Sequence, residues 1–519
     1  MNLAEWYSKG FWLATYSLVL WHNSRNHEGW TKLFQLGLVL GFTSYAISFS
    51  FLPLTAGTKL IILFKDLLTL GVISSIFHAL RDYKKIYWLA IILLYAFSKL
   101  FLGQWQKSFL QQSSTSFQSQ PENEWEILIQ LDNHQDKSAI QPVLDKYHLI
   151  AESSFELNET DATDLDNYYS IEIPENIEDQ ITDIKTELSL CKHVIWIEDN
   201  EVINIDPLEN NEVSDNKTPF KSLTNDPYTT QQWSIESLGW NQVMNLFKEG
   251  LLKPKKRAKI FILDTGVDGN HEDLKGNYES FNKGSDADDM GHGTHVAGIA
   301  GAVTNNALGI SSVNPGPEFI SVSSIKVLGK FGAGTQRDII NAILKAADAG
   351  ADVINMSLGG RSLDSRQKAY NEAVEYANKK GTIIVVAAGN DNTDARNYAP
   401  ANAKGVITVS AINEEMNKAP FSNFVNDIQY KIAAPGTNIY SCTPNNQYAA
   451  FNGTSMAAPF VTGLVALMKS IKPELNTREI YDILSTSGSE SKNPDQTGKV
   501  IHAGRAIEQL VQASKDDLR

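Results

Sequence analysis

The sequence predicts an α/β fold for its C-terminal half, in which a parallel β-sheet carries helices on both faces. From residue 258 onward, short apolar runs that end in glycine alternate with stretches of helical periodicity, and this alternation is typical of parallel sheets. The chain is 519 residues long, which is too long for one ordinary domain. We therefore expect other units before the sheet, namely membrane-spanning helices at the N terminus followed by a small α+β domain.

Five strands and three helices are expected in the α/β part. The strands are the runs AKIFILDTG, EFISVSSIKVLG, ADVINMSLGG, GTIIVVAAGN and GVITVSAI, and the helices are Ile339–Ala349, Asp364–Asn378 and Met456–Ile471. Polar residues follow three of these strands, namely Asp264, Ser357 and Asn390. Because functional residues of parallel sheets gather at the carboxyl ends of the strands, we expect the functional site at this edge.

Residues 1–105 are predicted to form a membrane region. Leu33–Leu54 has no charged residue over 22 positions, which is enough helix to cross a bilayer. Leu60–Leu80 and Ile86–Trp105 are nearly as apolar, and Gly10–Trp21 is a shorter uncharged run. We expect three helices to cross the membrane, and a fourth if the shortest run also crosses. A cleavable signal peptide is disfavoured, because its apolar stretch would be shorter and would not be repeated.

The placement of basic residues predicts the orientation of these helices. Three basic residues lie within five positions after Leu80, and Arg25 and Lys32 precede the Leu33–Leu54 run. Short loops rich in lysine and arginine stay in the cytoplasm. With both basic segments on the cytoplasmic side, everything after Trp105 is expected to lie outside the cytoplasm.

The middle of the chain is strongly acidic. Between Pro121 and Asn210 the sequence has 23 aspartates and glutamates against 4 lysines and no arginine, a local charge of −19 in a chain of net charge −15. This excess marks residues 124–205 as a domain of its own, and the polar segments 106–123 and 206–224 are expected to be linkers. The acidity also disfavours nucleic acid as a partner, since phosphate binding needs a basic surface.

Strand and helix signals alternate within this acidic domain. The expected elements are a strand at Glu124–Leu131, a helix at Ser138–His148, a strand at Asn167–Ile173, a helix at Ile177–Leu190 and one or two strands within His193–Ile205. The strands show a two-residue apolar period and the helices a longer one. A strand–helix–strand order that occurs twice is typical of a small split βαβ domain.

Three motifs in the α/β part point to nucleophilic catalysis. They are DTGVD with Asp264, GHGTHVAG with His292 and GTSMAAP with Ser455. A serine hydroxyl is a poor nucleophile at neutral pH and needs an adjacent base. His292 would accept the proton of Ser455, and Asp264 would fix the histidine tautomer and stabilise its charged form. Gly453 and Thr454 lead the chain into a helix, so that the helix N terminus would favour an oxyanion near Ser455.

These motifs, in the order Asp, His, Ser, resemble those of the subtilisin-like serine proteases, the subtilases. The resemblance covers roughly residues 225–511, which would form the catalytic domain. It implies that Asn390 donates a hydrogen bond to the oxyanion. It also implies that Ser357, Leu358 and Gly359 pair with the substrate backbone by β-augmentation. Lys499, in GKVIHAGRAIEQL, stands where the family usually has glycine.

Two further segments resemble parts of subtilases. VIWIEDNEVINI, residues 194–205, resembles the end of the family's propeptides, which implies that the acidic domain helps the catalytic domain to fold and covers its active site. VTNNALGI, residues 303–310, resembles the family's high-affinity calcium loop. The resemblance implies a structural calcium ion with ligands from Asp226, Asp273, Thr304, Asn306, Leu308 and Ile310. An ordinary asparagine-rich turn remains the alternative for this loop.

Two classes of function are compatible with these residues. The first is a membrane-anchored serine endopeptidase that hydrolyses protein or peptide substrates outside the cytoplasm through an acyl-enzyme. The second is a membrane receptor or adaptor that has lost catalysis and keeps the fold as a binding module. Retention of all three triad residues and of Asn390 favours the endopeptidase. Asp391, which follows Asn390, predicts a mild preference for basic or polar substrate side chains.

Two smaller questions stay open at this level. His292 and His295 are three residues apart on a predicted helix and could share a metal ion, but no third ligand is evident. The chain has two cysteines, Cys191 and Cys442. Two cysteines do not make a disulfide framework, and their spacing does not show whether they pair.

Overall fold

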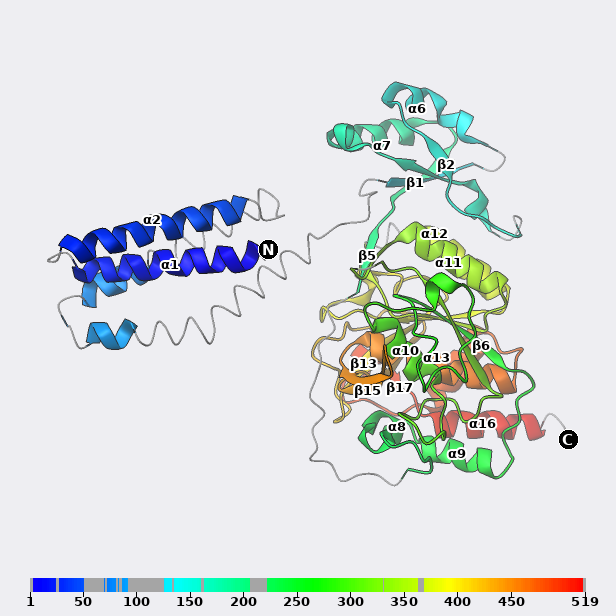
Figure 1. Cartoon of the computed structure of the whole chain (residues 1–519). Coiled ribbons are helices and arrows are strands. Elements are labelled where there is room, and N and C mark those ends of the chain that lie inside the picture. The colour runs from blue at the N-terminus through cyan, green and yellow to red at the C-terminus, as the bar shows by residue number, and fades with distance from the viewer. Residues whose placement is uncertain are drawn as a thin grey trace. The chain divides into compact units, whose positions relative to one another are not determined.

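The computed structural model describes most of the chain in two compact units, Met1–Gln120 and Pro121–Arg519 (Figure 1). The described residues are 3–24, 28–50, 70, 72–80, 83, 86–91, 126–132, 135–159, 163–205, 222–329, 331–362 and 368–516.

The N-terminal unit contains two long helices, α1 (Leu3–Ser24) and α2 (Glu28–Ser50), which pack against each other. The predicted crossing Leu33–Leu54 lies on α2 as far as residue 50, and Gly10–Trp21 lies on α1. Of the other two predicted crossings, residues 72–80 and 86–91 are helical, and most of the remainder lies outside the described residues.

One described helix is both long and apolar enough to span a bilayer, and it belongs to the C-terminal unit. It is Thr454–Ile471, which is 94% buried inside the fold. A buried core helix satisfies the same test of length and composition. The membrane prediction for residues 1–105 therefore gains no support from this test.

The acidic domain is a four-stranded antiparallel sheet covered on one face by two helices. Its strands are β1 (Glu126–Leu131), β2 (Ala151–Ser153), β3 (Tyr168–Glu172) and β4 (Val194–Asp199), in the order β2-β3-β1-β4, and its helices are α6 (Gln141–Tyr147) and α7 (Ile181–Leu190). Ile127 and Ile129 pack against these helices, whereas Leu128 belongs to the core on the opposite face. The strand and helix signals of the sequence are all present as elements.

A seven-stranded parallel sheet forms the centre of the C-terminal unit. Its order is β17-β14-β13-β11-β9-β6-β7. The strands are β6 (Ala258–Asp264), β7 (Ile320–Lys326), β9 (Val353–Met356), β11 (Ile383–Ala387), β13 (Ile407–Ile412), β14 (Lys431–Pro435) and β17 (Lys499–Val500). The five strands expected from apolar runs are confirmed, and β14 was not predicted.

Helices cover both faces of this sheet, as the alternation of strands and helices predicts. The helices are α8 (Trp233–Ser237), α9 (Trp240–Lys248), α10 (His292–Gly301), α11 (Gln336–Asp348), α12 (Lys368–Lys379), α13 (Thr454–Ile471), α14 (Thr477–Ser487), α15 (Pro494–Thr497) and α16 (Ala503–Asp516). Side chains of β6 alternate between two cores. Ile260 and Ile262 pack with α10 and α13, while Phe261 and Leu263 pack with α11 and α12.

Three short antiparallel pairs lie outside the central sheet. They are β5 (Val202–Asn204) with β8 (Ala333–Thr335), β10 (Gly360–Arg361) with β12 (Tyr398–Ala399), and the hairpin β15 (Ile439–Thr443) with β16 (Gln447–Phe451). The first pair joins the end of the acidic domain to the α/β part.

Candidate active site

Asp264 and His292 meet at the carboxyl end of β6. Asp264 is the last residue of this strand and His292 is the first residue of α10. The Nδ1 atom of His292 lies 2.7 Å from Oδ1 of Asp264, and both side chains are buried. Gly293 makes this approach feasible, because a Cβ atom there would lie 2.0 Å from the carbonyl oxygen of Gly266. This contact orients the imidazole through its Nδ1 atom.

Asp288 holds the start of α10, and sequence reasoning missed it. Its carboxylate accepts hydrogen bonds from the backbone N–H of Gly291 (2.8 Å) and from both the N–H (2.9 Å) and the hydroxyl (2.7 Å) of Thr294. It also accepts one from the hydroxyl of Thr265, 2.8 Å away. A carboxylate at a helix N terminus is stabilising, and this one fixes the turn that delivers His292.

Ser455 is the second residue of α13, and Gly453 lies just before the helix. Gly453 has φ +148°, a backbone conformation that L side chains rarely adopt. The hydroxyl of Ser455 donates to the carbonyl oxygen of Ser357 (3.1 Å), and the hydroxyl of Ser357 donates to the carbonyl oxygen of Ser455 (2.8 Å). The structure therefore brings the predicted nucleophile to the predicted substrate strand.

Asn390 is oriented by the residue before the nucleophile. Its Oδ1 atom accepts from the backbone N–H (2.8 Å) and the hydroxyl (2.9 Å) of Thr454. With the oxygen bound in this way, Asn390 can donate only through its NH₂ group. Asn390 and Ser455 line one common pocket, which is the arrangement that an oxyanion donor requires.

His295 packs in the core. It is fully buried, its Nε2 atom lies 3.1 Å from the carbonyl oxygen of Ala449, and its ring stacks on Phe451 at 4.3 Å. Burial lowers the pKa of His295 to about 3, so the ring is neutral at physiological pH. Among the described residues, no group of three histidine, cysteine, aspartate or glutamate side chains is arranged to hold a metal ion.

The end of the acidic domain lies in the cleft beside Ser455. Strand β5 pairs with β8, with Val202 opposite Thr335 and Ile203 opposite Gly334. On its other side Asn204 forms an antiparallel bridge with Gly359. The next N–H, from Ile205, donates to the carbonyl oxygen of Gly332 (3.0 Å). Residues 202–205 therefore occupy the place between two strands where a peptide would bind by β-augmentation.

Polar contacts anchor the acidic domain on α11 and α12. Arg337 of α11 forms an ion pair with the buried carboxylate of Glu126, and its N–H donates to Asn200 (2.8 Å). Glu198 accepts from the amide of Gln336 (3.1 Å) and from the N–H of Ala369 (3.3 Å). Burial raises the pKa of Glu198 to about 7.

The pocket beside Ser455 has a volume of about 240 Å³. Its walls come from the substrate strand, from the segment after β11, from β12, from the start of α13 and from the end of the acidic domain. The lining residues are Val202, Asn204, Ile205, Ser357, Leu358, Gly359, Gly360, Arg361, Ala387, Gly389, Asn390, Asp391, Tyr398, Thr454 and Ser455. All three predicted substrate-strand residues are among them.

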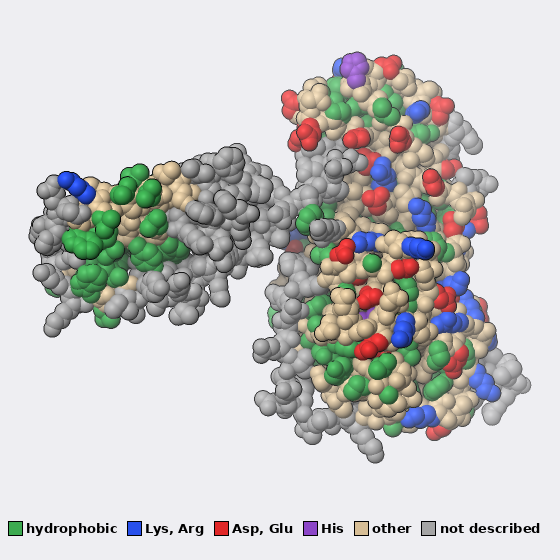
Figure 2. All heavy atoms as spheres, viewed as in Figure 1, with side chains coloured by type: hydrophobic (Ala, Val, Ile, Leu, Met, Phe, Trp, Pro, Cys, Tyr) green, Lys and Arg blue, Asp and Glu red, His purple; other side chains and the backbone are tan. Residues whose placement is uncertain are grey.

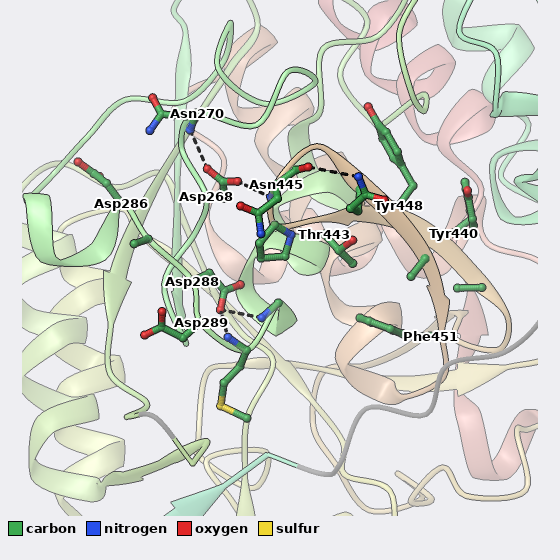
Figure 3. A pocket seen from close by; sticks show the side chains of 17 residues that line it. Asp268, Asn270, Asp286, Asp288, Asp289, Tyr440, Thr443, Asn445, Tyr448 and Phe451 are labelled. Atoms are coloured by element: carbon green, nitrogen blue, oxygen red, sulfur yellow. Dashed lines mark hydrogen bonds between the residues drawn. The ribbon is translucent and has the colours of Figure 1, made fainter.

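A second, larger cleft of about 1030 Å³ lies next to the start of α10. Figure 3 shows Asp288 and Asp289 on one side of it and the aromatic rings of Tyr440, Tyr448 and Phe451, from the β15–β16 hairpin, on the other. Its lining contains four aspartates and, among the described residues, no lysine, arginine or histidine. No motif in the sequence pointed to this cleft.

The predicted calcium loop surrounds two buried carboxylates. Asp226 accepts from the N–H groups of Asn305 (2.8 Å) and Asn306 (3.0 Å), and Asp273 accepts from the side-chain amide of Asn306 (2.8 Å) and the N–H of Ile310 (2.9 Å). Within the described parts of the chain, neither carboxylate has an ion pair. The pKa of Asp273 is raised to about 7, mainly by burial and in smaller part by the nearby Asp226.

These residues fit a bound cation. Two neighbouring buried carboxylates without a countercharge favour a hard metal ion with oxygen ligands. Gly309 packs directly on this site, because a Cβ atom there would lie 2.2 Å from Oδ2 of Asp273. The side chain of Thr304 turns toward Ser312, whose N–H it accepts (3.0 Å). Any ligand from Thr304 is therefore its backbone carbonyl.

The two cysteines do not pair. Cys191 is half-buried in the acidic domain, and Cys442 is buried in the β15–β16 hairpin; both are free thiols. Burial raises the pKa of both thiols, so each favours the protonated form.

Known proteins resemble this chain in sequence and in fold. A model of the subtilase family matches residues 255–500. Thermitase from Thermoactinomyces vulgaris is 40% identical over 252 residues, which cover 47% of this chain and 85% of thermitase. The chain belongs to the subtilase family. Subtilisin DY from Bacillus licheniformis is 38% identical over 252 residues, covering 47% of this chain and 87% of its own sequence.

The fold of this subtilase also matches a solved structure. Fervidolysin from Fervidobacterium pennivorans, a keratinolytic enzyme related to subtilisin, superimposes with a TM-score of 0.58 at 23% identity, covering 75% of this chain and 62% of that one. At this identity the match shows the fold alone. Taken with the sequence relatives, this subtilase is a subtilisin-like serine endopeptidase, and the alternative of a non-catalytic receptor loses its support.

Proposed function

We propose that this subtilase cleaves peptide bonds through Asp264, His292 and Ser455, and that a membrane anchor and an inhibitory acidic domain control where and when it acts. The observation that carries the catalytic proposal is the buried 2.7 Å contact between His292 and Asp264. This contact lies at the sheet edge where α13 begins. Ser455, in the first turn of α13, lies there beside the predicted substrate strand.

The proposed mechanism follows from these contacts. A substrate segment pairs with Ser357–Gly359, and the hydroxyl of Ser455 attacks the carbonyl carbon of the scissile bond. His292 accepts the hydroxyl proton and later gives it to the leaving amine, while Asp264 stabilises the imidazolium. The NH₂ group of Asn390 and the N–H groups at the start of α13 stabilise the oxyanion. Water then hydrolyses the acyl-enzyme by the same proton transfers.

A fluorophosphonate probe tests the nucleophile. We expect the full-length chain to be labelled at Ser455, and Ser455→Ala to lose all labelling. Ser485→Ala, a partly exposed serine on α14, is the matched control and should be labelled like the parent. Asp264→Asn should keep the fold but lower kcat by about 10⁴-fold, since the histidine tautomer is no longer fixed. Labelling that survives in Ser455→Ala would exclude Ser455 as the nucleophile.

The acidic domain is proposed to be an inhibitory propeptide. Support comes from residues 202–205, which lie in the cleft between Gly334 and Gly359, and from the ion pair of Glu126 with Arg337. A chain segment in this position blocks the binding of a substrate strand. Removing the ion pair between Glu126 and Arg337 should therefore raise the hydrolysis of short peptides.

Arg337→Ala tests this inhibition. We expect higher peptidase activity per probe-labelled site than in the parent chain, because Glu126 is left buried without its partner. Arg478→Ala, an exposed arginine on α14, is the matched control and should change nothing. Equal activity of Arg337→Ala and the parent would contradict the proposed inhibition.

Self-cleavage between the acidic and catalytic domains is part of the same proposal. Within the linker 206–224, the bonds before Pro207 and Pro219 have no N–H and are poor substrates. We therefore expect the new N terminus between residues 208 and 225, at a position other than 219. N-terminal sequencing of the purified chain checks this, and a second band that also forms in Ser455→Ala would assign the cut to another protease.

Calcium is proposed to stabilise the catalytic domain. The ligands would be the carboxylates of Asp226 and Asp273, the side-chain oxygen of Asn306 and backbone carbonyls of the 303–310 loop. When bound, the ion would neutralise the two carboxylates and fix the loop. Chelation should lower the unfolding temperature and added calcium should restore it. An unfolding temperature that is independent of both would contradict this role.

The N-terminal unit is proposed to anchor the enzyme in a membrane with the protease outside the cytoplasm. Support comes from the uncharged run Leu33–Leu54 and from large apolar side chains that α2 exposes, which Figure 2 shows as a patch on this unit. They are Trp30, Leu33, Leu36, Val39, Leu40 and Phe42. Exposed apolar patches of this kind mark membrane or protein contacts.

Membrane extraction and thiol labelling test anchoring and orientation. The chain should stay with the membrane after washing at alkaline pH. In intact cells an impermeant maleimide should label Cys191, and Cys191→Ser should remove the signal because Cys442 is buried. Labelling that appears only after lysis would place the acidic domain in the cytoplasm.

A further inference from the structure

We infer that Tyr398, with Asp391 and Arg361, closes the pocket that receives the substrate side chain next to the scissile bond, and that the enzyme prefers small, uncharged residues there. This inference rests on the proposed function, because it names the substrate class of the same site. It concerns the residue whose carbonyl carbon Ser455 attacks.

The strand register locates this pocket. Asn204 lies opposite Gly359 in an antiparallel bridge, so the residue two positions further along a bound strand lies opposite Ser357. The hydroxyl of Ser455 reaches the carbonyl oxygen of Ser357 at 3.1 Å. The residue opposite Ser357 is therefore the one whose carbonyl is attacked. Its side chain enters the 240 Å³ pocket that Ser455 shares with Asn390, Asp391 and Tyr398.

Tyr398 forms part of the wall of this pocket. Strand β12 holds it by pairing Tyr398 with Arg361 and Ala399 with Gly360. The side chain is 6% exposed. Its ring atoms lie 2.9 and 3.2 Å from the position that a Cβ atom on Gly389 would take. Since Gly389 directly precedes Asn390, the ring lies against the wall beneath the proposed oxyanion donor and takes space that a large substrate side chain would need.

The charge of Asp391 is already compensated. The hydroxyl of Tyr398 donates to Oδ2 of Asp391, and the Nε–H of Arg361 donates to the same oxygen at 3.1 Å. Arg361 Nε also lies 3.2 Å from the hydroxyl oxygen of Tyr398. A substrate lysine or arginine would have to displace the arginine already present. The basic preference expected from Asp391 alone is therefore replaced by a preference for uncharged residues.

The three residues act in different ways. Tyr398 sets the depth of the pocket, whereas Arg361 sets its charge. Arg361 is 74% exposed, so its removal uncovers Asp391 without opening the core. The two properties are thus separable by substitution at Tyr398 and at Arg361.

A peptide library tests the inference on the full-length chain in detergent. The peptides share one sequence and vary only the residue before the scissile bond, and rates are divided by the concentration of fluorophosphonate-labelled sites. For the parent enzyme we expect kcat/KM for alanine or serine to exceed that for phenylalanine and lysine by roughly tenfold or more, the usual scale of discrimination by pocket size. A parent enzyme that cleaves after phenylalanine as well as after alanine would overturn the inference.

Three variants separate depth from charge. Tyr398→Gly should gain roughly tenfold or more on phenylalanine and leucine. Tyr398→Phe keeps the ring, is the matched control, and should still reject them. Arg361→Gln should raise the rate after lysine by roughly threefold to tenfold, an effect that weakens with salt. Equal profiles of Tyr398→Phe and Tyr398→Gly would contradict the role given to the ring.

The probe distinguishes the two kinds of failure. A chain that the fluorophosphonate does not label would show that the proposed catalytic function is wrong. A labelled chain with a profile that favours large or basic residues would leave the function intact and refute the inference about Tyr398. A Tyr398→Gly chain that does not fold is recognised by loss of labelling, and the parent and Tyr398→Phe profiles then decide.

Discussion

Helices α2 and α13 are both long and apolar, yet the structure surrounds them differently. Helix α13 has 18 residues, is 94% buried, and contacts most strands of the parallel sheet. Helix α2 has 23 residues and packs on α1, but it exposes a row of large apolar side chains. Apolar length alone does not distinguish a core helix from a membrane helix. What distinguishes them is whether the fold covers the apolar surface.

The largest expected effect comes from a charge placed in α13. Leu464 is fully buried, and an unpaired buried carboxylate costs about 4 kcal/mol or more, a large part of the stability of a domain. We expect Leu464→Asp to abolish both cooperative unfolding and fluorophosphonate labelling. Ser485→Asp, at a partly exposed position of α14, is the control. A labelled Leu464→Asp chain would show that α13 is not covered as described.

The same substitution in α2 should have a different result. Leu40 is exposed, and an aspartate at the centre of a membrane helix costs about 2.5–3.5 kcal/mol. We expect Leu40→Asp to be extracted from membranes at alkaline pH while the labelled fraction stays unchanged. Leu40→Ile should remain in the membrane. Loss of labelling in Leu40→Asp would mean that the protease depends on this apolar surface, which would break the comparison.

Glycines sharpen the comparison at a smaller scale. A Cβ atom on Gly463 of α13 would lie 2.6 Å from the backbone oxygen of Ala300, whereas one on Gly37 of α2 would lie 2.5 Å from the hydroxyl oxygen of Ser17. Backbone cannot move aside, and overpacking of this kind costs about 1–3 kcal/mol. We expect Gly463→Ala to lower the unfolding temperature measurably and Gly37→Ala to lower it little, because a side chain can rotate. Equal effects would contradict this.

The smallest expected effect concerns the pH dependence of the contact between the acidic domain and helices α11 and α12. Burial raises the pKa of Glu198 from 4.5 to about 7, and this carboxyl contacts Gln336 of α11 and Ala369 of α12, so the docked state favours the protonated carboxyl. The stabilisation of docking is fully present below pH about 4.5 and is lost as the pH rises through about 7. Inhibition should therefore weaken over this range, and Glu198→Gln should flatten the change. Activity per labelled site against pH measures it.

Most strands of the central sheet and the polar residues at its edge could be predicted from the sequence, because they are recognised from local patterns. Runs such as KIFIL and IIVVA are apolar throughout, so each was recognisable as a buried strand, and the flanking motifs fixed Asp264, His292 and Ser455. Strand β14, Lys431–Pro435, is short and ends in proline, and its signal was too weak to recognise. Its place depends on pairing with β13 and β17, which is a property of the folded sheet.

The residues proposed to set specificity could not be predicted from the sequence, for a related reason. Asp391 suggested a preference for basic substrate side chains because it follows Asn390, the predicted oxyanion donor. Tyr398 and Arg361 contact the Asp391 carboxylate only because β10 pairs with β12. Asp288 is similar, since its role depends on the start of α10 folding around its carboxylate. Each of these residues acts through a contact between distant segments. A periodicity or a motif contains no record of such contacts.

Helix α13 carries the proposed nucleophile. It packs against most strands of the parallel sheet and comes late in the chain. During synthesis the chain emerges from its N terminus, so the acidic domain and the strands that hold Asp264 and His292 precede Ser455. Contacts between such distant segments form slowly. A ribosome-bound chain therefore contains the segment proposed to inhibit before it contains the hydroxyl of Ser455. Under this proposal, the order of the segments keeps the nucleophile covered from the moment it is made.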